Sequence, residues 1–317
     1  MNGAHLRWAC AGLVLAATIG GTLVDDAPDR APVTRAGLRV LEVDFHAHTR
    51  FADGFLSPFD LVIQARRRGL DALAITDHNI LFPALIGRFY ARHFGGPTIL
   101  TGEEITTRDY HVHGVGIEER IDASLPLEQV IDEVHRQGGV MIAAHPVKRF
   151  WPLLVPARAR FDAAEVMHPL AFGSSRGNNE WRWSEMRDYF EEARAGGQPI
   201  TAVASSDYHF FSPLGVTRTL VFAPTDSEAD VLDALKHGRT VVFDLEGKAY
   251  GDPDLVRALA EEPYSMRPQD YGYRGNGALD RILRIVGLIG LVGLVLFGKR
   301  RAPDGDDGGP AAPKSLR

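Results

Sequence analysis

The sequence has one cysteine and no long basic run, and each shortage excludes a class of protein. A single Cys among 317 residues excludes an intramolecular disulfide framework and a zinc site built from thiolates. The net charge of −6 argues against a dedicated nucleic-acid-binding domain, though not against a nucleotide as substrate. The charged fraction of 24% and the hydrophobic fraction of 45% are those of an ordinary globular protein.

Histidine, by contrast, is present in unusual number. Ten of the twelve histidines lie between His46 and His209, and several stand beside Asp or Glu. A lone histidine is most often a polar residue with a satisfied hydrogen bond. Ten of them near carboxylates raise the question of whether they build a site.

An uncharged run lies near each end of the chain. Ala9–Val24 predicts a signal peptide or signal anchor over residues 1–24. Ile285–Phe297 predicts a transmembrane helix over residues 282–298, with a buried core helix as the alternative.

The basic residues that flank these two runs predict a topology. Arg7 precedes the first run, and Lys299, Arg300 and Arg301 follow the second. Because cytoplasmic flanks are rich in Lys and Arg, we expect the protein in the cytoplasmic membrane with an extracytoplasmic (periplasmic) catalytic domain. Residues 299–317 are then a disordered cytoplasmic tail.

Between these ends, short β-rich runs alternate with amphipathic helical patterns. The expected strands are Arg39–Phe45, Leu70–Thr76, Thr98–Thr101, His111–Ile117, Val140–Ala144, Ala163–Met167, Ile200–Ala204, Val216–Phe222 and Thr240–Phe243. The first expected helix opens at Ser57 and runs to Gly69, and the others cover Leu81–Phe94, Ser124–Gln137, Asn179–Ala195 and Glu228–His237. This alternation predicts a parallel sheet covered by helices, closed into a distorted barrel with its active site at the carboxyl ends of the strands. The barrel domain is assigned to residues 39–245, between linkers at 25–38 and 246–281.

Most of the histidines fall where an expected strand ends. His46 and His48 end the first strand and, two residues apart, share one of its faces. The loop after them and the ends of four later strands carry Asp53, Asp77, His78, Glu103, His145, Asp207 and His209, and a fifth extended segment carries His113. Imidazole and carboxylate without thiolate suit Zn²⁺, Mn²⁺ or Fe²⁺. We therefore expect a metal site at this end of the barrel.

The runs DFHAHTRFADG, ITDHN, TGEE, HVHGVG, AAHP and SDYH, in this order, resemble the motif set of the PHP (polymerase and histidinol phosphatase) family over roughly Val40–Asp244. The resemblance implies a distorted (β/α)7 barrel, two or three divalent metal ions (Zn, Mn or Fe) and hydrolysis of phosphate esters. It assigns one metal to His46, His48, Glu103 and Asp207, a second to Glu103, His113 and His145, and a third to Asp53, His78 and His209.

Three positions qualify the resemblance. His111 lies two residues before His113 on the same expected strand. Ala52 stands where a Ser often precedes the motif Asp. Met167 and His168 stand where the family usually has a Tyr/Asn-like pair after Glu165. Neither of the last two features, which depart from the family pattern, removes a ligand.

The resemblance predicts a metal-dependent phosphoric ester hydrolase acting on a small phosphoester such as a nucleotide. A metal-bridging hydroxide would be the nucleophile, because divalent metals lower the pKa of bound water to about 7. The catalytic residues are then His46, His48, Glu103, Asp207 and His209. A general-acid role for His209 or His168 is secondary, and Asp77 is expected to orient a ligand.

Cationic residues after two strand ends are predicted to bind the substrate. These are Lys148 and Arg149, and further along Arg176, with a solvated helix face as the alternative. A carboxyl-ester, amide or carbamate hydrolase is the alternative function, since the same nucleophile attacks a carbonyl. An inactive, membrane-tethered binding module is a third possibility. An eight-stranded amidohydrolase barrel is disfavoured, because no metal-bridging Lys follows a middle strand.

Overall fold

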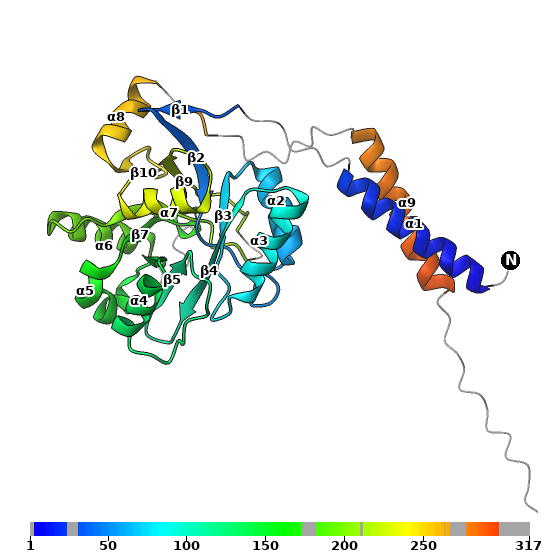
Figure 1. Ribbon diagram of the computed structural model, residues 1–317, viewed down its shortest axis with the longest axis horizontal. Coiled ribbons are helices and arrows are strands. Elements are labelled where there is room, and N and C mark those ends of the chain that lie inside the picture. The colour runs from blue at the N-terminus through cyan, green and yellow to red at the C-terminus, as the bar shows by residue number, and fades with distance from the viewer. Residues whose placement is uncertain are drawn as a thin grey trace, which may run out of the picture. The chain divides into compact units, whose positions relative to one another are not determined.

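The computed structural model describes residues 3–23, 31–172, 182–209, 212–262, 264–266 and 277–297 (Figure 1). The chain divides into two compact units. Residues 29–271 form the first, here termed the barrel unit. Residues 1–28 and 272–317, the two ends of the chain, form the second, here termed the helical unit.

The barrel unit contains one mixed sheet with helices around it (Figure 1). Its strands are β1 (Thr34–Arg35), β2 (Leu38–Asp44), β3 (Ala72–Ile75), β4 (Thr98–Thr106), β5 (His111–Val115), β6 (Val140–Ala143), β7 (Ala163–Met167), β8 (Thr201–Ala204), β9 (Thr219–Ala223), β10 (Thr240–Phe243) and β11 (Ala249–Gly251). Its α-helices are α2 (Pro58–Arg68), α3 (Phe82–Phe94), α4 (Leu127–Arg136), α5 (Trp151–Ala157), α6 (Trp183–Ala195), α7 (Glu228–Lys236) and α8 (Pro253–Glu261). Three short 3₁₀ helices are η1 (Lys148–Phe150), η2 (Arg158–Arg160) and η3 (Pro169–Phe172).

The sheet follows the order β11-β10-β9-β2-β3-β4-β5-β6-β7-β8, with β1 on β2. The expected parallel pairing is confirmed for β2–β3, β3–β4, β6–β7 and β7–β8. It is wrong for β5, which is antiparallel to both of its neighbours, and for β9 and β10. Strand β11, which was not predicted, is antiparallel to β10. The reason at β5 is the length of the connection. Four residues join it to β4, with Thr107 N–H donating to Tyr110 O, and such a turn permits only a hairpin.

The sheet nearly closes between β8 and the pair β9 and β10. Among the described strands no hydrogen-bonded ladder joins β8 to β9, and threonine side chains bridge the seam instead. Thr219 Oγ1 accepts from Ala204 N at 2.8 Å and lies 2.9 Å from Ala204 O, while Thr240 Oγ1 donates to Ala202 O at 2.7 Å. The structure is thus a nearly closed α/β barrel.

Helix α2 begins and ends at the residues that its capping sequence predicted. Ser57 Oγ caps α2 by accepting from Asp60 N at 3.2 Å, and Pro58 occupies the first helical position. The helix ends at Gly69, whose φ of 73° lies in the left-handed region that glycine adopts without strain.

The barrel interior changes character from one end to the other. At the amino ends of the strands it is apolar, with Leu41, Val43 and Leu100 packing against Val231 and Leu235 of α7. Helix α7 covers this end of the barrel. A hydrogen bond of 2.7 Å joins them, from Thr201 Oγ1 in the first residue of β8 to the backbone oxygen of Leu235 in α7. Polar side chains occupy the carboxyl ends, so the opposite end of the barrel is left for a site.

The chain continues as part of the barrel unit beyond residue 245, where a linker was expected. Strand β11 pairs with β10, and Leu255 and Leu259 of α8 are buried against Val40 and Phe222. The linker predicted for residues 246–281 is therefore wrong over this part, because α8 has an apolar face that packs on the sheet. Residues 267–276 lie outside the described residues.

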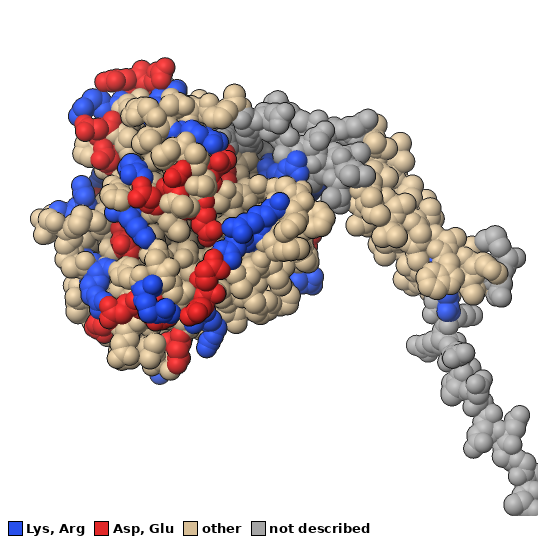
Figure 2. Space-filling view, in the orientation of Figure 1, with Lys and Arg blue, Asp and Glu red and all other residues tan. Residues whose placement is uncertain are grey.

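The helical unit is a pair of antiparallel helices, α1 (Gly3–Leu23) and α9 (Gly277–Phe297), which lie side by side (Figure 1). Gly20 of α1 lies near Leu283 of α9, while a Cβ on Gly290 would come within 2.8 Å of Cys10 O. Glycine at this position of α9 thus permits close approach of the two backbones. Figure 2 shows few charged side chains on the described part of this unit, in contrast to the mixed charges of the barrel unit.

In the described part of the chain, no helix has the length and apolar character needed to cross a membrane. The transmembrane helix predicted for residues 282–298 and a membrane-spanning anchor in residues 1–24 are therefore not supported. In α9, Arg281 and Arg284 occupy the first turns and leave Ile285–Phe297. Thirteen residues rise only about 20 Å, against a hydrocarbon core of about 30 Å. The extracytoplasmic location stays a prediction, and the tail at 299–317 lies outside the described residues.

Candidate metal centre

The structure confirms that the histidines and carboxylates meet at one end of the barrel. His46 and His48 follow β2, His78 follows β3, and His145 follows β6. Further side chains come from β4, β5 and the segments after β7 and β8. They are Glu104, His111, His113, His168, Asp207 and His209. The carboxyl ends of the parallel strands therefore supply most of the cluster, and β5, which runs antiparallel, contributes His111 from its amino end.

Four side chains form the middle of the cluster: His46, His48 and Glu104 are fully buried, and Asp207 is partly buried. His46 Nε2 and His48 Nε2 lie 2.9 Å apart. Asp207 Oδ1 lies 3.0 and 3.2 Å from these two nitrogens. Glu104 Oε2 lies 3.5 and 3.4 Å from them. Ligand atoms around a tetrahedral Zn²⁺, at about 2.0–2.1 Å from the ion, stand about 3.3 Å apart, so the spacing of these four atoms fits a metal.

Buried atoms without hydrogen-bond partners support the same interpretation. Glu104 Oε2 and Asp207 Oδ1 are buried carboxylate oxygens that accept no hydrogen bond, and His48 Nδ1 is a buried nitrogen without one. Leaving such groups unpaired is costly in a protein interior. A divalent cation among them would satisfy the two oxygens.

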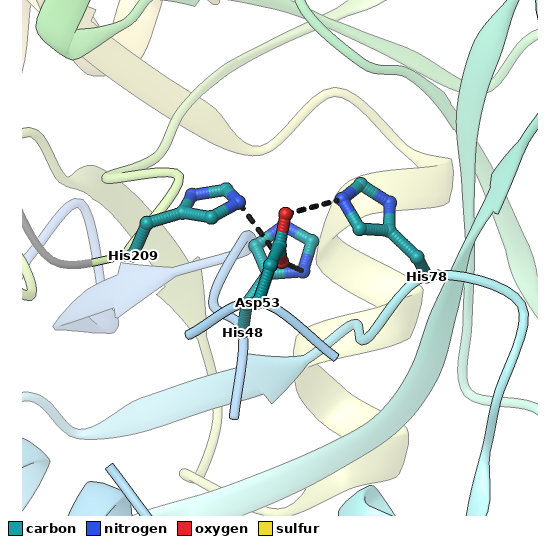
Figure 3. A group of neighbouring side chains, drawn as sticks. All are labelled: His48, Asp53, His78 and His209. Atoms are coloured by element: carbon teal, nitrogen blue, oxygen red, sulfur yellow. Dashed lines mark ion pairs between the residues drawn. The ribbon is translucent and has the colours of Figure 1, made fainter. Parts of the chain in front are cut away.

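A second group lies beside the first and shares His48 with it (Figure 3). Figure 3 shows the Asp53 carboxylate between the rings of His78 and His209. Asp53 Oδ2 lies 3.3 Å from His78 Nε2, and Asp53 Oδ1 lies 3.1 Å from His209 Nε2. The loop that carries Asp53 turns back at Gly54, where a Cβ would collide with the His48 carbonyl. The sequence assigned these three residues to one metal, and the structure brings them together.

A third group consists of Glu104, His111 and His145. Glu104 Oε1 lies 2.8 Å from His111 Nδ1 and 3.2 Å from His145 Nε2. Since Oε2 of the same carboxylate belongs to the middle group, Glu104 stands between two of the three groups. This is the position that the sequence analysis gave to Glu103.

Glu103 lies on the other face of β4. In the antiparallel register Glu104 is opposite His113 and Glu103 is opposite Gly114, so Glu104 faces the barrel interior. Glu103 Oε1 instead accepts from the backbone N–H of Ile121. The place in the cluster predicted for Glu103 is thus occupied by Glu104, because adjacent strand residues point to opposite faces.

The structure likewise separates the two histidines of β5. His111 reaches Glu104 Oε1, whereas His113 is fully buried below the cluster, its ring centroid 4.0 Å from that of His46. Both ring nitrogens of His113 lack a hydrogen-bond partner. The predicted place of His113 beside His145 is therefore occupied by His111, and His113 packs edge-on against His46.

Glu165 of β7 was not among the predicted site residues. Its Oε1 lies 3.1 Å from His46 Nδ1 and accepts from Ser205 Oγ, and its Oε2 accepts from His145 N at 2.6 Å. A carboxylate on the far nitrogen of a ligating imidazole fixes the tautomer and orients the ring. Glu165 lies two residues after Ala163 on β7, so both point into the barrel interior. This spacing was the feature of the sequence that could have identified Glu165 as a site residue.

Asp77 was expected to orient a metal ligand, but its carboxylate accepts hydrogen bonds from Thr49 and from no histidine among the described residues. Its two oxygens accept from Thr49 N and Thr49 Oγ1, both at 2.6 Å. Burial raises the pKa of Asp77 to about 6. Through Thr49, Asp77 fixes the start of the loop that leads to Asp53.

The charges of the cluster are strongly coupled. Burial alone would lower the pKa of His46, but Asp207, Glu165 and Glu104 raise it well above its usual value. Burial likewise lowers the pKa of His78, but the carboxylates of Asp53 and Glu104 outweigh burial and raise this pKa to about 10. The histidines in turn hold the pKa of Glu104 and of Asp207 well below the usual range despite burial. These carboxylates are ionised and require cations, which protonated imidazoles or metal ions can supply.

The backbone is strained at the cluster. His145 and Asp207 have φ angles of 26° and 42°, and Asn79, next to His78, has a φ of 55°. Positive φ values at residues other than glycine cost of the order of 1–3 kcal/mol and concentrate at functional sites. Two proposed ligands thus owe their positions to conformations that a structural residue rarely adopts.

Two of the three predicted substrate-binding cations, Lys148 and Arg149, do not line the cavity over the cluster. This cavity of about 360 Å³ is lined by imidazoles, the carboxylates of Glu104 and Asp207, and Leu170. Arg149 donates to Arg108 O at 3.4 Å and lies 5.1 Å from the ring centroid of Phe150. Lys148 lies 5.6 Å from the ring centroid of Trp151. Arg176 lies outside the described residues.

Comparison with known proteins gives both a family model and relatives. A family model described as PHP-associated matches residues 193–240. An uncharacterised protein of Methanocaldococcus jannaschii is 29% identical over 117 residues, which are 33% of this chain and 68% of that protein. A 5'-3' exoribonuclease of Haemophilus influenzae is 32% identical over 80 residues, which are 24% of this chain and 29% of that enzyme.

A solved structure shows the same fold. It is a two-domain protein of Bacteroides vulgatus that contains a predicted PHP-like metal-dependent phosphoesterase. The superposition has a TM-score of 0.57 at 22% sequence identity and covers 74% of each chain. The nearly closed α/β barrel is therefore shared with a protein of this kind.

Proposed function

Since the chain belongs to the PHP (polymerase and histidinol phosphatase) family, we propose that it is a metal-dependent hydrolase of phosphate esters. The observation that carries the proposal is the Glu104 carboxylate. One of its oxygens lies with His46, His48 and Asp207, and the other lies with His111 and His145. Such a carboxylate shared between two ligand groups suits a pair of neighbouring divalent ions.

The residues fit two or three divalent ions of Zn, Mn or Fe. His46, His48, Glu104 and Asp207 would hold one, Glu104, His111 and His145 a second, and Asp53, His78 and His209 a third. When bound, such ions lower the pKa of a coordinated water to about 7 and neutralise the charge of a phosphoryl group. Glu165 and the buried His113 position His46 in this arrangement.

The cavity over the cluster sets what reaches these residues. His168 Nδ1 accepts from Leu170 N at 3.2 Å, so its Nε2 carries the proton and donates to Asp207 Oδ2 at 3.2 Å. His168 thus holds Asp207 from the cavity side. Leu170 is the apolar residue among those that line this cavity.

A substrate panel on the full-length protein loaded with Mn²⁺ or Zn²⁺ tests the proposal. Phosphomonoesters, bisnucleotides and short single strands are compared with carboxyl esters, amides and carbamates. We expect turnover of phosphate esters that is abolished by Glu104→Gln. Turnover of carboxyl esters, amides or carbamates alone would exclude the phosphoesterase.

One observation favours the second candidate, a carboxyl-ester, amide or carbamate hydrolase. Among the described residues no Lys or Arg lines the cavity over the cluster. A neutral carbonyl substrate needs no such cation, whereas a phosphate would depend on the metals for its countercharge. The same panel decides between the two candidates.

A further inference from the structure

A second cavity, of about 510 Å³, adjoins the one over the metal-ligand cluster. The two share His168, Leu170, Asp207 and His209 as lining residues. They therefore meet at these residues, two of which, Asp207 and His209, are proposed ligands. A molecule reacting at the cluster can extend directly into this second cavity.

The outer wall of the second cavity is apolar. Pro169, Phe172, Pro213 and Val216 form it, together with Ser212. Ser212 Oγ donates its hydrogen to Ser206 O at 2.8 Å, so it has no free donor for a ligand. Among the described lining residues of both cavities there is no Lys or Arg.

Hydrogen bonds to the strand ends hold both sides of this wall in place. On one side, η3 is fixed to His168, which accepts from Ala171 N at 2.9 Å and from Leu170 N at 3.2 Å. On the other, Gly215 N donates to Asp44 Oδ2 at 2.9 Å, and Asp44 also accepts from Ser206 N. The cavity is thus preformed on the scaffold that positions Asp207.

We propose that this second cavity, the apolar pocket, binds the alcohol portion of the substrate, and that this portion is an uncharged aryl or alkyl group. The proposal rests on the proposed function. A nucleobase, a sugar or a second phosphate would bury polar edges or charge against an outer wall whose described residues supply no free donor and no Lys or Arg, which is costly. An apolar group gains the free energy of leaving water instead.

The reaction then balances as an ordinary hydrolysis. The P–O bond to the alcohol oxygen breaks and a P–O bond to the oxygen of water forms. One proton of that water ends on the leaving oxygen and the other remains with the phosphate. The products are an apolar alcohol and hydrogen phosphate, and no oxidant or reductant is required.

Binding of phosphonates tests the pocket without turnover. Titration calorimetry of the Zn²⁺-loaded full-length protein compares benzylphosphonate with methylphosphonate, which differ only by the ring. We expect benzylphosphonate to bind about tenfold or more tightly, as burial of a ring predicts. Phe172→Ala should lose most of this preference. Phe172 is 52% exposed, so its truncation leaves the buried core intact.

The matched control is Phe89→Ala, which removes an equally exposed ring from α3, away from both cavities. It should retain the preference. Equal affinities for the two phosphonates in the unaltered protein would overturn the proposal, as would a preference that survives Phe172→Ala.

Kinetics separate this inference from the proposed function. We expect kcat/KM for naphthyl phosphate to exceed that for glycerol phosphate and for a nucleoside monophosphate. Phe172→Ala should raise KM for naphthyl phosphate alone. Hydrolysis of phosphate esters without this preference would refute the pocket and leave the phosphoesterase standing. Absence of all phosphoesterase activity would refute the function, while the calorimetry still decides the pocket.

Discussion

Neighbouring glutamates on β4 have opposite surroundings. Glu104 lies among imidazoles inside the barrel, while Glu103 meets the backbone of Ile121 on the helix-covered face. Both are buried and both are carboxylates, so they form a natural matched pair of variants. Their difference gives two predictions.

The first concerns metal binding. Glu104→Gln replaces an ionised oxygen in two ligand groups by an amide, so we expect it to lose at least one bound metal per chain and to reduce kcat by about 100-fold or more. Glu103→Gln should retain the metal content and the activity. Metal analysis by plasma mass spectrometry and initial-rate kinetics provide the comparison. Loss of metal in the Glu103 variant alone would return the bridging role to Glu103.

The second concerns the pH dependence of stability. Burial raises the pKa of Glu103 to about 7, well above the ordinary value of a glutamate side chain. The folded protein therefore binds the proton of the Glu103 carboxyl more tightly than the unfolded chain does. The contribution of this group to the free energy of unfolding is fully present below about pH 4.5 and is lost as the pH rises through about 7. Glu103→Gln removes this loss and should stabilise the protein by about 1–3 kcal/mol at pH 8, but little at pH 4.5. Denaturant unfolding at both pH values measures it, and equal effects at the two would contradict the assignment.

The sequence predicted the residue types of the cluster better than their individual places. Asp53, His78, His145, Asp207 and His209 lie in the cluster as expected. Glu103 and His113 do not take the predicted positions, because the face that a strand residue occupies depends on register. The register of β4 and β5 comes from their hairpin pairing. Glu165 was missed because a carboxylate within an apolar strand carries no spacing signal of its own.

At the scale of elements, the positions of helices and strands followed from caps, glycines and apolar periodicity. The direction of β5 did not, because the residue pattern of a short strand does not show whether it pairs parallel or antiparallel to its neighbours. The short turn at 107–110 between β4 and β5 was the feature that decides it. Helices α1 and α9 were expected as separate segments, since contact between the two ends of a chain leaves no local pattern.

The pairing of α1 with α9 gives a third prediction. A Cβ at Gly293 would lie 3.4 Å from Cys10 Cβ, close to the spacing in disulfides. Gly293→Cys should therefore form an intramolecular disulfide with Cys10 under mild oxidation, seen as a linked peptide by mass spectrometry. Gly287→Cys is the matched control, because its nearest neighbour is Ala17. Equal linkage in both variants, or none with Gly293→Cys, would contradict the pairing.

At the scale of the whole molecule, the barrel has a stable end and a strained end. Helix α7 and an apolar interior close the amino ends of the strands. The carboxyl ends gather buried carboxylates, imidazoles and residues with positive φ. The fold thus concentrates unfavourable conformations and like charges where a bound cation can offset them.

Metal removal gives a fourth prediction, for the stability of the whole molecule. A ligand at 100 times its dissociation constant stabilises a folded protein by about 2.7 kcal/mol, or roughly 5–10 °C in a barrel of this size. Chelation should lower the Tm by about this amount, and Zn²⁺ or Mn²⁺ should restore it. Glu104→Gln should show a smaller shift than Glu103→Gln. A Tm unaffected by chelator in the unaltered protein would show that the cluster needs no metal.

The most direct measurement of the central claim is anomalous X-ray diffraction from crystals of the metal-loaded protein at the absorption edge of the bound metal. We expect one peak among His46 Nε2, His48 Nε2, Glu104 Oε2 and Asp207 Oδ1, and a second peak beside His111 and His145. Crystals soaked in metal that show no anomalous peak at these side chains would contradict it.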